Sequence, residues 1–544
     1  MRTIIIGAVA LGASCAARLK RLDPTHEVVL LEKGNYASFA NCGLPYFVGD
    51  EIKQQENLLV VDKSVFINRF NIDLRTRSEV IRITPKENKV LILDHDANKT
   101  YELEYDNLVL AMGADAITPR IEGVDNPHVH FLKTVDDAVK LKDDMKTAKS
   151  IAVVGGGFIG LEAMENLINI NKEVHLIEGR PSVSTLDYDM ALILEDLIRK
   201  HGVNLHLNTL VQGIKEDSDG KLIVNTSTGD IKVDEVLLAI GVKPNTKLAV
   251  DAGIELDENR IIKVDDNLRT NYKNIYAGGD LVSNYEAISN HLVYIPLANY
   301  ANKHGRIIAN NIKGIESKRQ KITMASVFKC FEYTVASVGL GEVMANKFEL
   351  ESDVLYQNGP SHATYYPGAT RVHSKLRYSK DGKILGAQML GQNLVEKRID
   401  VLSSLLLHDA TYMDLMEVES CYAPPYGSAK DILNFYGFMI DNTINGGLKS
   451  IEPLKLKEIE NEVFILDVRD PYSYKLHHIA NAYNIPSDQL RQRANELPKN
   501  STIYVYCNVG ITSYNAICLL KEYGFKDLVN VSGGYTLYSE MFKN

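Results

Sequence analysis

Six cysteines are the first residues of this sequence whose chemistry could define a function. They stand at positions 15, 42, 330, 421, 507 and 518, with no regular spacing and no CxxC pair. This distribution argues against a disulfide framework and against a zinc site, so we expect no metal centre. It suits a chain that stays in a reducing cytoplasm. Sulfur chemistry in this chain would therefore use single thiols.

Cys507 has the local context of a reactive thiol. It follows an apolar run, residues 502–506, that reads as a buried strand, and it opens the segment NVGITS before a predicted helix. Successive backbone N–H groups and the helix dipole at that point could stabilise a thiolate or a persulfide.

The chain begins with the pattern of strand, tight turn and helix. A short β-branched strand breaks at Gly7, and a helical pattern follows from Gly12. A second apolar strand ends at Glu32, twenty residues past Gly12, where a dinucleotide fold places its ribose-binding carboxylate. Val9 replaces the middle glycine, so the fingerprint is incomplete.

A second copy of this pattern is complete. An apolar strand leads into GGGFIG, in which Gly155, Gly157 and Gly160 serve the turn, the approach of the pyrophosphate and helix packing. The next strand ends at Glu178, whose carboxylate can bind a free ribose 2′-hydroxyl but repels a 2′-phosphate. This favours NADH, although Arg180 could accept that phosphate and leaves NADPH open. Two such folds predict two bound dinucleotides.

Length and charge limit the remaining classes. With 544 residues there is room for three or four domains. The formal net charge of −10 argues against a nucleic-acid partner. No stretch approaches the ~18 apolar residues of a membrane span. The N-terminus faintly resembles a signal peptide ending at Cys15, but a strand entering a nucleotide-binding turn fits those residues better.

Three further segments resemble those of flavoprotein disulfide reductases that bind two dinucleotides. NIYAGGD, which ends at Asp280, resembles their second FAD motif, and the resemblance implies that this aspartate meets the ribityl and phosphate part of the flavin. YDNLVLAMGA, with Gly113, and LAIGVKPN, with Gly241, resemble the segments that cross into the NAD domain and return. The implied order is an FAD fold, an inserted NAD fold and the FAD fold resumed.

Three other segments resemble the coenzyme A disulfide reductases: SFANCGLPYF at 38–47, ATYYPG at 363–368 and CYAPPY at 421–426. Many reductases of this superfamily carry a CxxxxC pair, but here Phe47 stands at the partner position. The resemblance implies that Cys42 is the redox cysteine beside the flavin. A lone cysteine must be oxidised as a mixed disulfide with a small thiol, a persulfide or a sulfenic acid.

The same resemblance implies that Tyr365 and Tyr422 reach over this cysteine from the other subunit of a homodimer. A phenol there can donate a hydrogen bond to a sulfur anion or supply a proton to a departing thiolate. The alternative is a pair of interface aromatics whose hydroxyls merely find a partner.

For coenzyme A itself, the resemblance implies that Ser38 and Asn41 hold the pantetheine amides. Arg18 and Arg21, one helical turn apart, are placed to bind its phosphates through their planar guanidinium groups. A solvated helix face is the alternative for the two arginines.

The sequence starts afresh near residue 450. LDVRDPYSY, YCNVGITSYNA and VSGGY resemble a single rhodanese domain, with Cys507 at the catalytic position. Many active rhodaneses carry arginine where this chain has Thr512, which weakens binding of anionic thiosulfate. A persulfide donor or acceptor other than thiosulfate is favoured, and a catalytically silent interaction domain is the alternative.

We therefore expect an α/β protein with two Rossmann-like dinucleotide-binding domains, an α+β dimerisation domain and a C-terminal α/β rhodanese domain. The expected ranges are 1–148 and 263–320 for the FAD domain, 149–262 for NAD(P)H, 321–445 for dimerisation and 446–544 for rhodanese. The expected activity is NADH-dependent reduction of CoA disulfide, CoA persulfide or polysulfide through FAD and Cys42. The rivals are an NADH oxidase cycling Cys42 through sulfenic acid and a sulfur or redox sensor.

Overall fold

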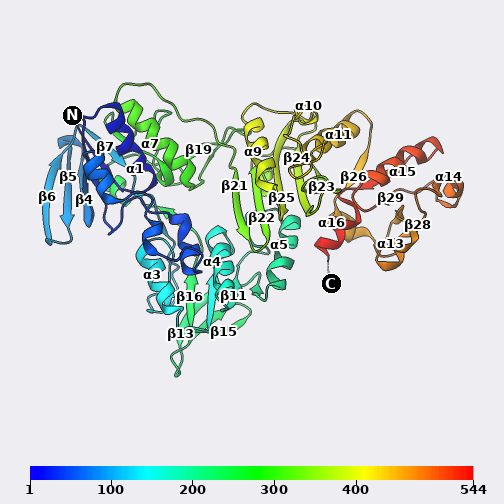
Figure 1. Cartoon of the computed structure of the whole chain (residues 1–544), viewed down its shortest axis with the longest axis horizontal. Coiled ribbons are helices and arrows are strands. Elements are labelled where there is room, and N and C mark those ends of the chain that lie inside the picture. Colours follow the sequence, from blue (N-terminus) through cyan, green and yellow to red (C-terminus); the bar gives the residue numbers. More distant parts are fainter. Residues whose placement is uncertain (543–544) are drawn as a thin grey trace. The chain divides into compact units, whose positions relative to one another are not determined.

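The computed structural model describes residues 1–542, which fold into two compact units (Figure 1). Of the described residues, the first unit comprises 1–180, 203–286 and 290–322, and the second comprises 181–202, 287–289 and 323–542. The α/β class is confirmed, because parallel sheets flanked by helices make up both Rossmann-like folds and the C-terminal domain.

The first sheet of unit one is parallel, with strand order β18-β7-β1-β2-β3. The isoleucines of its central strand at positions 4–6 are buried, as expected for a strand covered on both faces, and the buried Thr3 hydroxyl hydrogen-bonds to His26. Helices α1 and α7 lie side by side (Figure 1), and a Cβ on Gly305 would meet the Leu11 carbonyl oxygen at 2.6 Å, so this contact requires glycine. The elements are β1 (Arg2–Ile6), α1 (Ala10–Leu22), β2 (Glu27–Leu31), β3 (Asp73–Arg75), β7 (Asn107–Leu110), β18 (Ile275–Ala277) and α7 (Ala298–Ile312).

A second parallel sheet has strand order β12-β11-β10-β16-β9. Residues Ile151–Val154 of its central strand are almost entirely buried. Its elements are β9 (Val129–His130), α3 (Val135–Asp144), β10 (Ser150–Val154), α4 (Phe158–Asn169), β11 (Glu173–Ile177), β12 (Asn204–His206) and β16 (Glu235–Leu238).

Short antiparallel elements complete unit one. Two three-stranded sheets are β4 (Ser78–Thr84), β5 (Lys89–Asp94) and β6 (Lys99–Glu104), and β13 (Val211–Glu216), β14 (Leu222–Thr226) and β15 (Gly229–Val233). Two pairs are β8 (Ala114–Ala116) with β17 (Val242–Pro244), and β19 (Asn284–Tyr285) with β20 (Leu292–Val293). The short helices are η1 (Asn41–Gly43), α2 (Leu44–Val48), η2 (Gln55–Leu58), η3 (Val65–Arg69), η4 (Pro85–Glu87), α6 (Lys247–Asp251) and η5 (Gly279–Leu281).

Unit two contains an antiparallel sheet of order β21-β22-β25-β24-β23. Helix α11 begins with a capping box, and its N-cap Asp431 also holds the buried Arg398 at 2.8 Å. The elements are α5 (Tyr188–Lys200), β21 (Ser326–Cys330), β22 (Tyr333–Gly339), α8 (Glu342–Lys347), β23 (Asp353–Pro360), β24 (Arg371–Tyr378), β25 (Ile384–Gly391), α9 (Val395–Leu406), α10 (Tyr412–Met416) and α11 (Ile432–Ile444).

The C-terminal part of unit two is a parallel sheet of order β26-β30-β29-β27-β28 with helices around it. Its core joins Leu466, Val505 and Ile517 from two strands and the helix after Cys507. The elements are β26 (Lys449–Ile451), α12 (Pro453–Ile459), β27 (Phe464–Asp467), α13 (Pro471–Leu476), β28 (Tyr483–Asn484), α14 (Leu490–Arg493), η6 (Ala494–Glu496), β29 (Ile503–Tyr506), α15 (Ile511–Glu522), β30 (Leu528–Val531) and α16 (Gly534–Met541).

Candidate active site

The first glycine turn, after β1, is built for a close backbone approach. Gly7 has φ +103°, and a Cβ there would lie 2.3 Å from the Ala111 carbonyl oxygen. At Gly12 a Cβ would lie 1.8 Å from the Gly7 oxygen, so α1 packs directly on the turn. Glu32, just after β2, accepts hydrogen bonds from the amides of Ala8 and Gly34, both at 2.9 Å. The turn and the carboxylate are therefore held together.

The second glycine turn, after β10, repeats this construction. Gly155 has φ +109°, and a Cβ at Gly160 would lie 1.9 Å from the Gly155 oxygen. A Cβ built on Gly157, in contrast, would have no neighbouring atom within 4 Å. The open space lies at the N-cap of α4, where a pyrophosphate would approach the backbone and the helix dipole. These residues therefore fit a dinucleotide.

Glu178 closes this second site at the end of β11. Its carboxylate accepts a hydrogen bond from the Gly156 amide at 2.7 Å and pairs with the Arg180 Nε at 3.1 Å. Burial alone would raise the pKa of this carboxyl, but the Arg180 hydrogen bonds hold it below its usual value. Arg180 would have to leave Glu178 to bind a 2′-phosphate, so the arrangement favours a free ribose.

The other flavin-motif residues converge in unit one. Asp280 lies in η5, and its Oδ2 is 3.9 Å from the Cβ position of Gly113, which has φ +65°. Burial raises the pKa of Asp280. The His304 Nδ1 accepts a hydrogen bond from the Gly279 amide at 3.1 Å, and burial lowers the pKa of this histidine to about 4, which keeps it neutral. Gly241 has φ +117° in the return segment before β17.

Two buried polar atoms near this region have no hydrogen-bond partner among residues 1–542. They are the Asn41 Oδ1 and the Tyr294 hydroxyl, and the Asp280 charge acts on the latter. Buried polar groups are normally hydrogen-bonded, so both atoms fit a polar ligand such as the flavin or pantetheine. Asn41 was predicted from the sequence, whereas Tyr294 was not.

Cys42 lies in η1, directly before α2. The segment is fixed by the Ser38 amide donating to the Ala8 oxygen and the Ala40 amide donating to the Leu58 oxygen, both at 2.8 Å. Ser38 itself has φ +51°, an uncommon conformation for a residue with a side chain. The thiol is solvent-accessible but crowded by protein atoms, and this burial is the main cause that raises its pKa.

Three charged groups act on Cys42, and two of them, Glu162 and Lys133, were not predicted from the sequence. Glu162 and Asp280 raise the pKa of the thiol, and Lys133 lowers it. Glu162 lies in α4, two residues beyond the last glycine of the second fingerprint, and accepts a hydrogen bond from the Tyr46 hydroxyl at 3.3 Å. In the sequence, only its position just after the glycine fingerprint marks Glu162 as a candidate. Its contact with α2 could not be predicted, because α2 and α4 are separate elements.

Burial raises the pKa of Glu162 to about 7, despite the lowering effect of the Tyr46 hydrogen bond. The carboxyl is therefore protonated below that pH and charged above it, where it opposes ionisation of Cys42. We expect Glu162→Gln to speed alkylation of reduced Cys42 by iodoacetamide at pH 8, by up to about tenfold for one pKa unit. Mass spectrometry measures the rate, and Glu173→Gln, on β11, is the control. An unchanged rate would show that Glu162 does not govern the thiol.

The two arginines predicted to bind phosphate lie on α1. The Arg18 Nε donates to the Asn310 Oδ1 at 3.0 Å, and the Arg21 guanidinium lies 5.2 Å from the ring centre of Phe70. Each is held by a protein partner, and both remain near the surface for an anionic ligand.

In unit two the structure brings Tyr365 and Tyr422 together, although 57 positions separate them. Their hydroxyl oxygens are 2.7 Å apart, and this hydrogen bond raises the pKa of Tyr365. Their exposures are 73% and 49%. Such a pair of exposed phenols can face a ligand that lies outside its own unit.

Cys507 follows β29 at the mouth of a loop that ends in α15. Its Sγ accepts a hydrogen bond from the Gly510 amide at 3.2 Å and contacts the Ser513 hydroxyl at 3.5 Å. Gly510, with φ +100°, is the N-cap of α15. The sulfur is therefore cradled by donors at a helix N-terminus, an arrangement that stabilises a sulfur anion.

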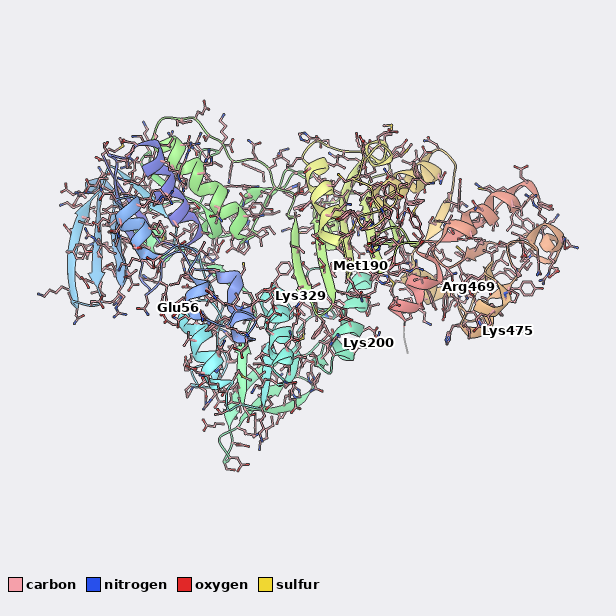
Figure 2. All side chains as sticks on the ribbon, viewed as in Figure 1. Glu56, Met190, Lys200, Lys329, Arg469 and Lys475 are labelled. Atoms are coloured by element: carbon pink, nitrogen blue, oxygen red, sulfur yellow. The ribbon has the colours of Figure 1, made fainter. Side chains whose placement is uncertain are left out.

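Arg469 of the rhodanese-like part does not replace the arginine that is absent at Thr512. Arg469, labelled in Figure 2, pairs with Asp467 at 2.6 Å and lies 4.1 Å from the ring centre of Tyr535. Its charge is neutralised and its side chain is buried. An anionic donor at Cys507 would therefore rely on the backbone amides of the loop.

The loop between β30 and α16, which lies next to Cys507, is tied to strand β23. The Asn358 Nδ2 donates to the Gly533 oxygen at 2.8 Å, and the Tyr356 amide donates to the Ser532 hydroxyl at 2.9 Å. The Tyr535 amide, just beyond, donates to the Cys507 oxygen at 2.8 Å.

Within residues 1–542, no helix is both long and apolar enough to span a membrane.

Family profiles match three parts of the chain. The profile described as pyridine nucleotide-disulphide oxidoreductase matches residues 1–305, and the dimerisation-domain profile of the same family matches residues 325–431. A rhodanese-like domain profile matches residues 452–541.

Individual proteins extend this similarity. A coenzyme A disulfide reductase from Staphylococcus haemolyticus is 34% identical over 442 residues, covering 80% of this chain and 98% of the relative. The crystal structure of reduced CoADR-RHD from Bacillus anthracis has a TM-score of 0.95 and 38% identity, covering 99% of this chain and 98% of the other. A NAD-dependent persulfide reductase from A. fulgidus has a TM-score of 0.93 and 33% identity, covering 99% and 100%.

Proposed function

This chain belongs to the pyridine nucleotide-disulphide oxidoreductase family, and from that premise we propose that it reduces CoA disulfide, CoA persulfide or polysulfide with electrons from NADH. The family uses FAD and NAD(P)H, and the two glycine turns with Glu32 and Glu178 fit these two dinucleotides. The observation that carries the proposal is an exposed cysteine, Cys42, without a CxxxxC partner, in the flavin-binding unit of a chain that also carries a rhodanese-like domain.

The proposed reaction uses Cys42 as the sulfur carrier. Bound FAD supplies the chemistry of accepting two electrons from NADH and passing them to sulfur. Reduction of a Cys42 mixed disulfide releases CoA thiol and leaves the Cys42 thiolate, which attacks the next disulfide sulfur. Each CoA disulfide consumes one NADH and one proton and gives two CoA thiols and NAD⁺. Each CoA persulfide gives one CoA thiol and one hydrogen sulfide.

The remaining predicted residues have supporting roles in this proposal. Cofactor contacts come from Gly7, Gly12, Gly113, Asp280, Gly155, Gly157, Gly160 and Gly241. Ser38 and Asn41 hold the pantetheine arm, and Arg18 and Arg21 bind CoA phosphates. The free Asn41 Oδ1 supports this assignment. The domain boundaries given by the sequence and a cytoplasmic location belong to the same proposal.

An NADH oxidase is the second candidate from the sequence. It would cycle Cys42 through sulfenic acid and would need neither the Tyr365 and Tyr422 pair nor a rhodanese-like domain. The similarity to the persulfide reductase covers 99% of this chain, rhodanese-like part included, and favours the reductase.

A steady-state assay with intact-mass measurement tests the proposed function. Turnover of NADH should require CoA disulfide or CoA persulfide, and hydrogen sulfide should appear only with sulfane sulfur. The mass of the resting protein should fall by that of one CoA per chain after treatment with reductant. NADH consumption that needs only oxygen, with no thiol released, would support the oxidase instead.

We also infer a homodimer in which the tyrosines act across the subunits, since a dimerisation-domain profile covers Tyr365 and Tyr422. Mixing Cys42→Ser subunits with a Tyr365→Phe, Tyr422→Phe variant should give heterodimers that keep one intact site. Their activity should exceed the average of the two parents. Heterodimers that equal this average after proven subunit exchange would place the tyrosines in cis or outside catalysis.

A further inference from the structure

A cluster of histidine and carboxylate side chains lies in unit one outside the proposed catalytic site. His130 ends β9, Asp144 ends α3 and Glu235 begins β16. The His130 Nε2 is 2.8 Å from the Glu235 Oε2 and 3.6 Å from the Asp144 Oδ2. One ligand atom from each residue lies within 4.8 Å of the others. Two neighbouring elements, β9 and α3, and the distant strand β16 thus direct metal-binding atoms at one point.

The surroundings of this cluster call for a cation. The side chains of His130 and Glu235 are almost fully buried, and that of Asp144 is one-third exposed. Asp144 also stands at the C-terminus of α3, where the helix dipole disfavours a negative charge. Among the residues that the structure describes, neither carboxylate has an ion pair with lysine or arginine. Two carboxylates this close repel each other unless a positive charge lies between them.

His128 supports the cluster from one side. It lies two residues before His130, and its Nδ1 is 3.0 Å from the Glu235 Oε1. The His128 amide donates to the Asn126 Oδ1 at 2.9 Å, which fixes the segment. One oxygen of Glu235 is thereby held by His128 while the other faces His130. Outer hydrogen bonds of this kind orient the carboxylate ligands of metal ions.

We propose that His130, Asp144 and Glu235 bind one divalent transition-metal ion of the Zn²⁺ type. Ligand atoms of a tetrahedral ion with bonds of about 2.0–2.1 Å lie about 3.4 Å apart, and the two distances from the His130 Nε2 bracket that value. Imidazole favours Zn²⁺ over Mg²⁺ and Ca²⁺. A water molecule completes the coordination on the exposed side of Asp144. From the cysteine pattern we expected no metal centre, whereas this proposed site uses no cysteine.

This site is separate from the dinucleotide. Gly155 follows the carboxyl end of β10, whereas Glu235 begins the neighbouring parallel strand β16 at its opposite end. The metal joins β9, an edge strand of two residues, to α3 and β16. The role of the metal is to fix this edge of the nucleotide-binding sheet. This structural role is separate from the proposed reductase activity.

Metal titration of the whole FAD-loaded protein tests this proposal. After chelator treatment, calorimetry should show a Zn²⁺ site that is present in the wild type and lost in His130→Asn, and Zn²⁺ should raise the wild-type unfolding temperature. His128→Asn should weaken binding about tenfold. His95→Asn is the matched control, because His95 pairs with Glu79 at 3.0 Å without a third ligand.

Co²⁺ distinguishes this site from thiols. Co²⁺ bound to the wild type should give a weak visible absorption band, without the intense near-ultraviolet absorption that thiolate ligands give. This band should be lost in His130→Asn. If His130→Asn does not fold, Asp144→Asn at the one-third exposed ligand replaces it and should also lose the site. Equal Zn²⁺ binding in the wild type and these variants, or no binding in any of them, would overturn the proposal and leave a histidine–carboxylate contact without a metal.

Discussion

Cys42→Ser is expected to yield a yellow, FAD-loaded protein that no longer couples NADH oxidation to reduction of CoA disulfide or persulfide. The flavin-binding turn, Glu32 and Asp280 do not depend on this side chain. The hydroxyl of serine neither forms a mixed disulfide nor leaves as a stable anion at neutral pH. We therefore expect turnover to fall on the order of 10³-fold or more, as when other catalytic nucleophiles are removed.

Two measurements on the same preparation make this test specific. NADH oxidation by an artificial one-electron acceptor reports hydride transfer to the flavin and should stay near the wild-type rate. Intact mass should show no reductant-labile CoA adduct. Undiminished disulfide turnover in this variant would refute the mechanism, and loss of both activities together with FAD would indicate a structural defect.

The sequence predicted the parts of the fold that depend on local patterns. The Rossmann-like class is confirmed because strand periodicity, glycine spacing and the carboxylate at the next strand end all lie within about 30 residues of one another. The positive φ of Gly7 and Gly155 shows why only glycine suits those turns. The catalytic roles assigned to Cys42, Tyr365, Tyr422 and Cys507 stay predictions.

Contacts between distant elements could not be predicted in this way. Glu162 affects Cys42 because α4 lies against α2, and neither helix carries a sequence signal for that pairing. The Tyr365 and Tyr422 contact joins two irregular loops for the same reason. Sequence periodicity describes which face of an element is buried but not its partner.

The position of α5 gives a further example. The sequence places residues 181–202 inside the expected NAD(P)H range, yet they belong to the second compact unit. Lys375 on β24 pairs with Asp187 and Asp189 at 2.9 Å, and all three side chains are buried. Buried charges this close require their partners, which holds the start of α5 to the β24 sheet. A domain boundary placed along the sequence cannot show that a segment inside one range belongs to the other compact unit.

Cys507→Ser is expected to separate two activities. CoA disulfide can react with Cys42 directly, and the flavin and CoA contacts lie before residue 450, so this activity should stay within about twofold of wild type for a variant remote from the chemistry. Reduction of persulfide or polysulfide should fall by roughly tenfold or more, because sulfane sulfur travels by thiolate attack through persulfide intermediates. Hydrogen sulfide release and CoA disulfide turnover, measured on one preparation, give the comparison.

Two further variants show whether the effect comes from the sulfur itself. Cys518→Ser, at an exposed cysteine of α15, is the matched control and should retain both activities. Asn358→Ala removes the hydrogen bond from β23 to the Gly533 oxygen while leaving the Cys507 sulfur in place. We expect a smaller loss of hydrogen sulfide release than in Cys507→Ser, because the loop at Gly533 beside Cys507 is loosened but the nucleophile remains. Equal loss of both activities in Cys507→Ser would assign this cysteine a structural role, and no loss of either would favour a domain used only for interaction.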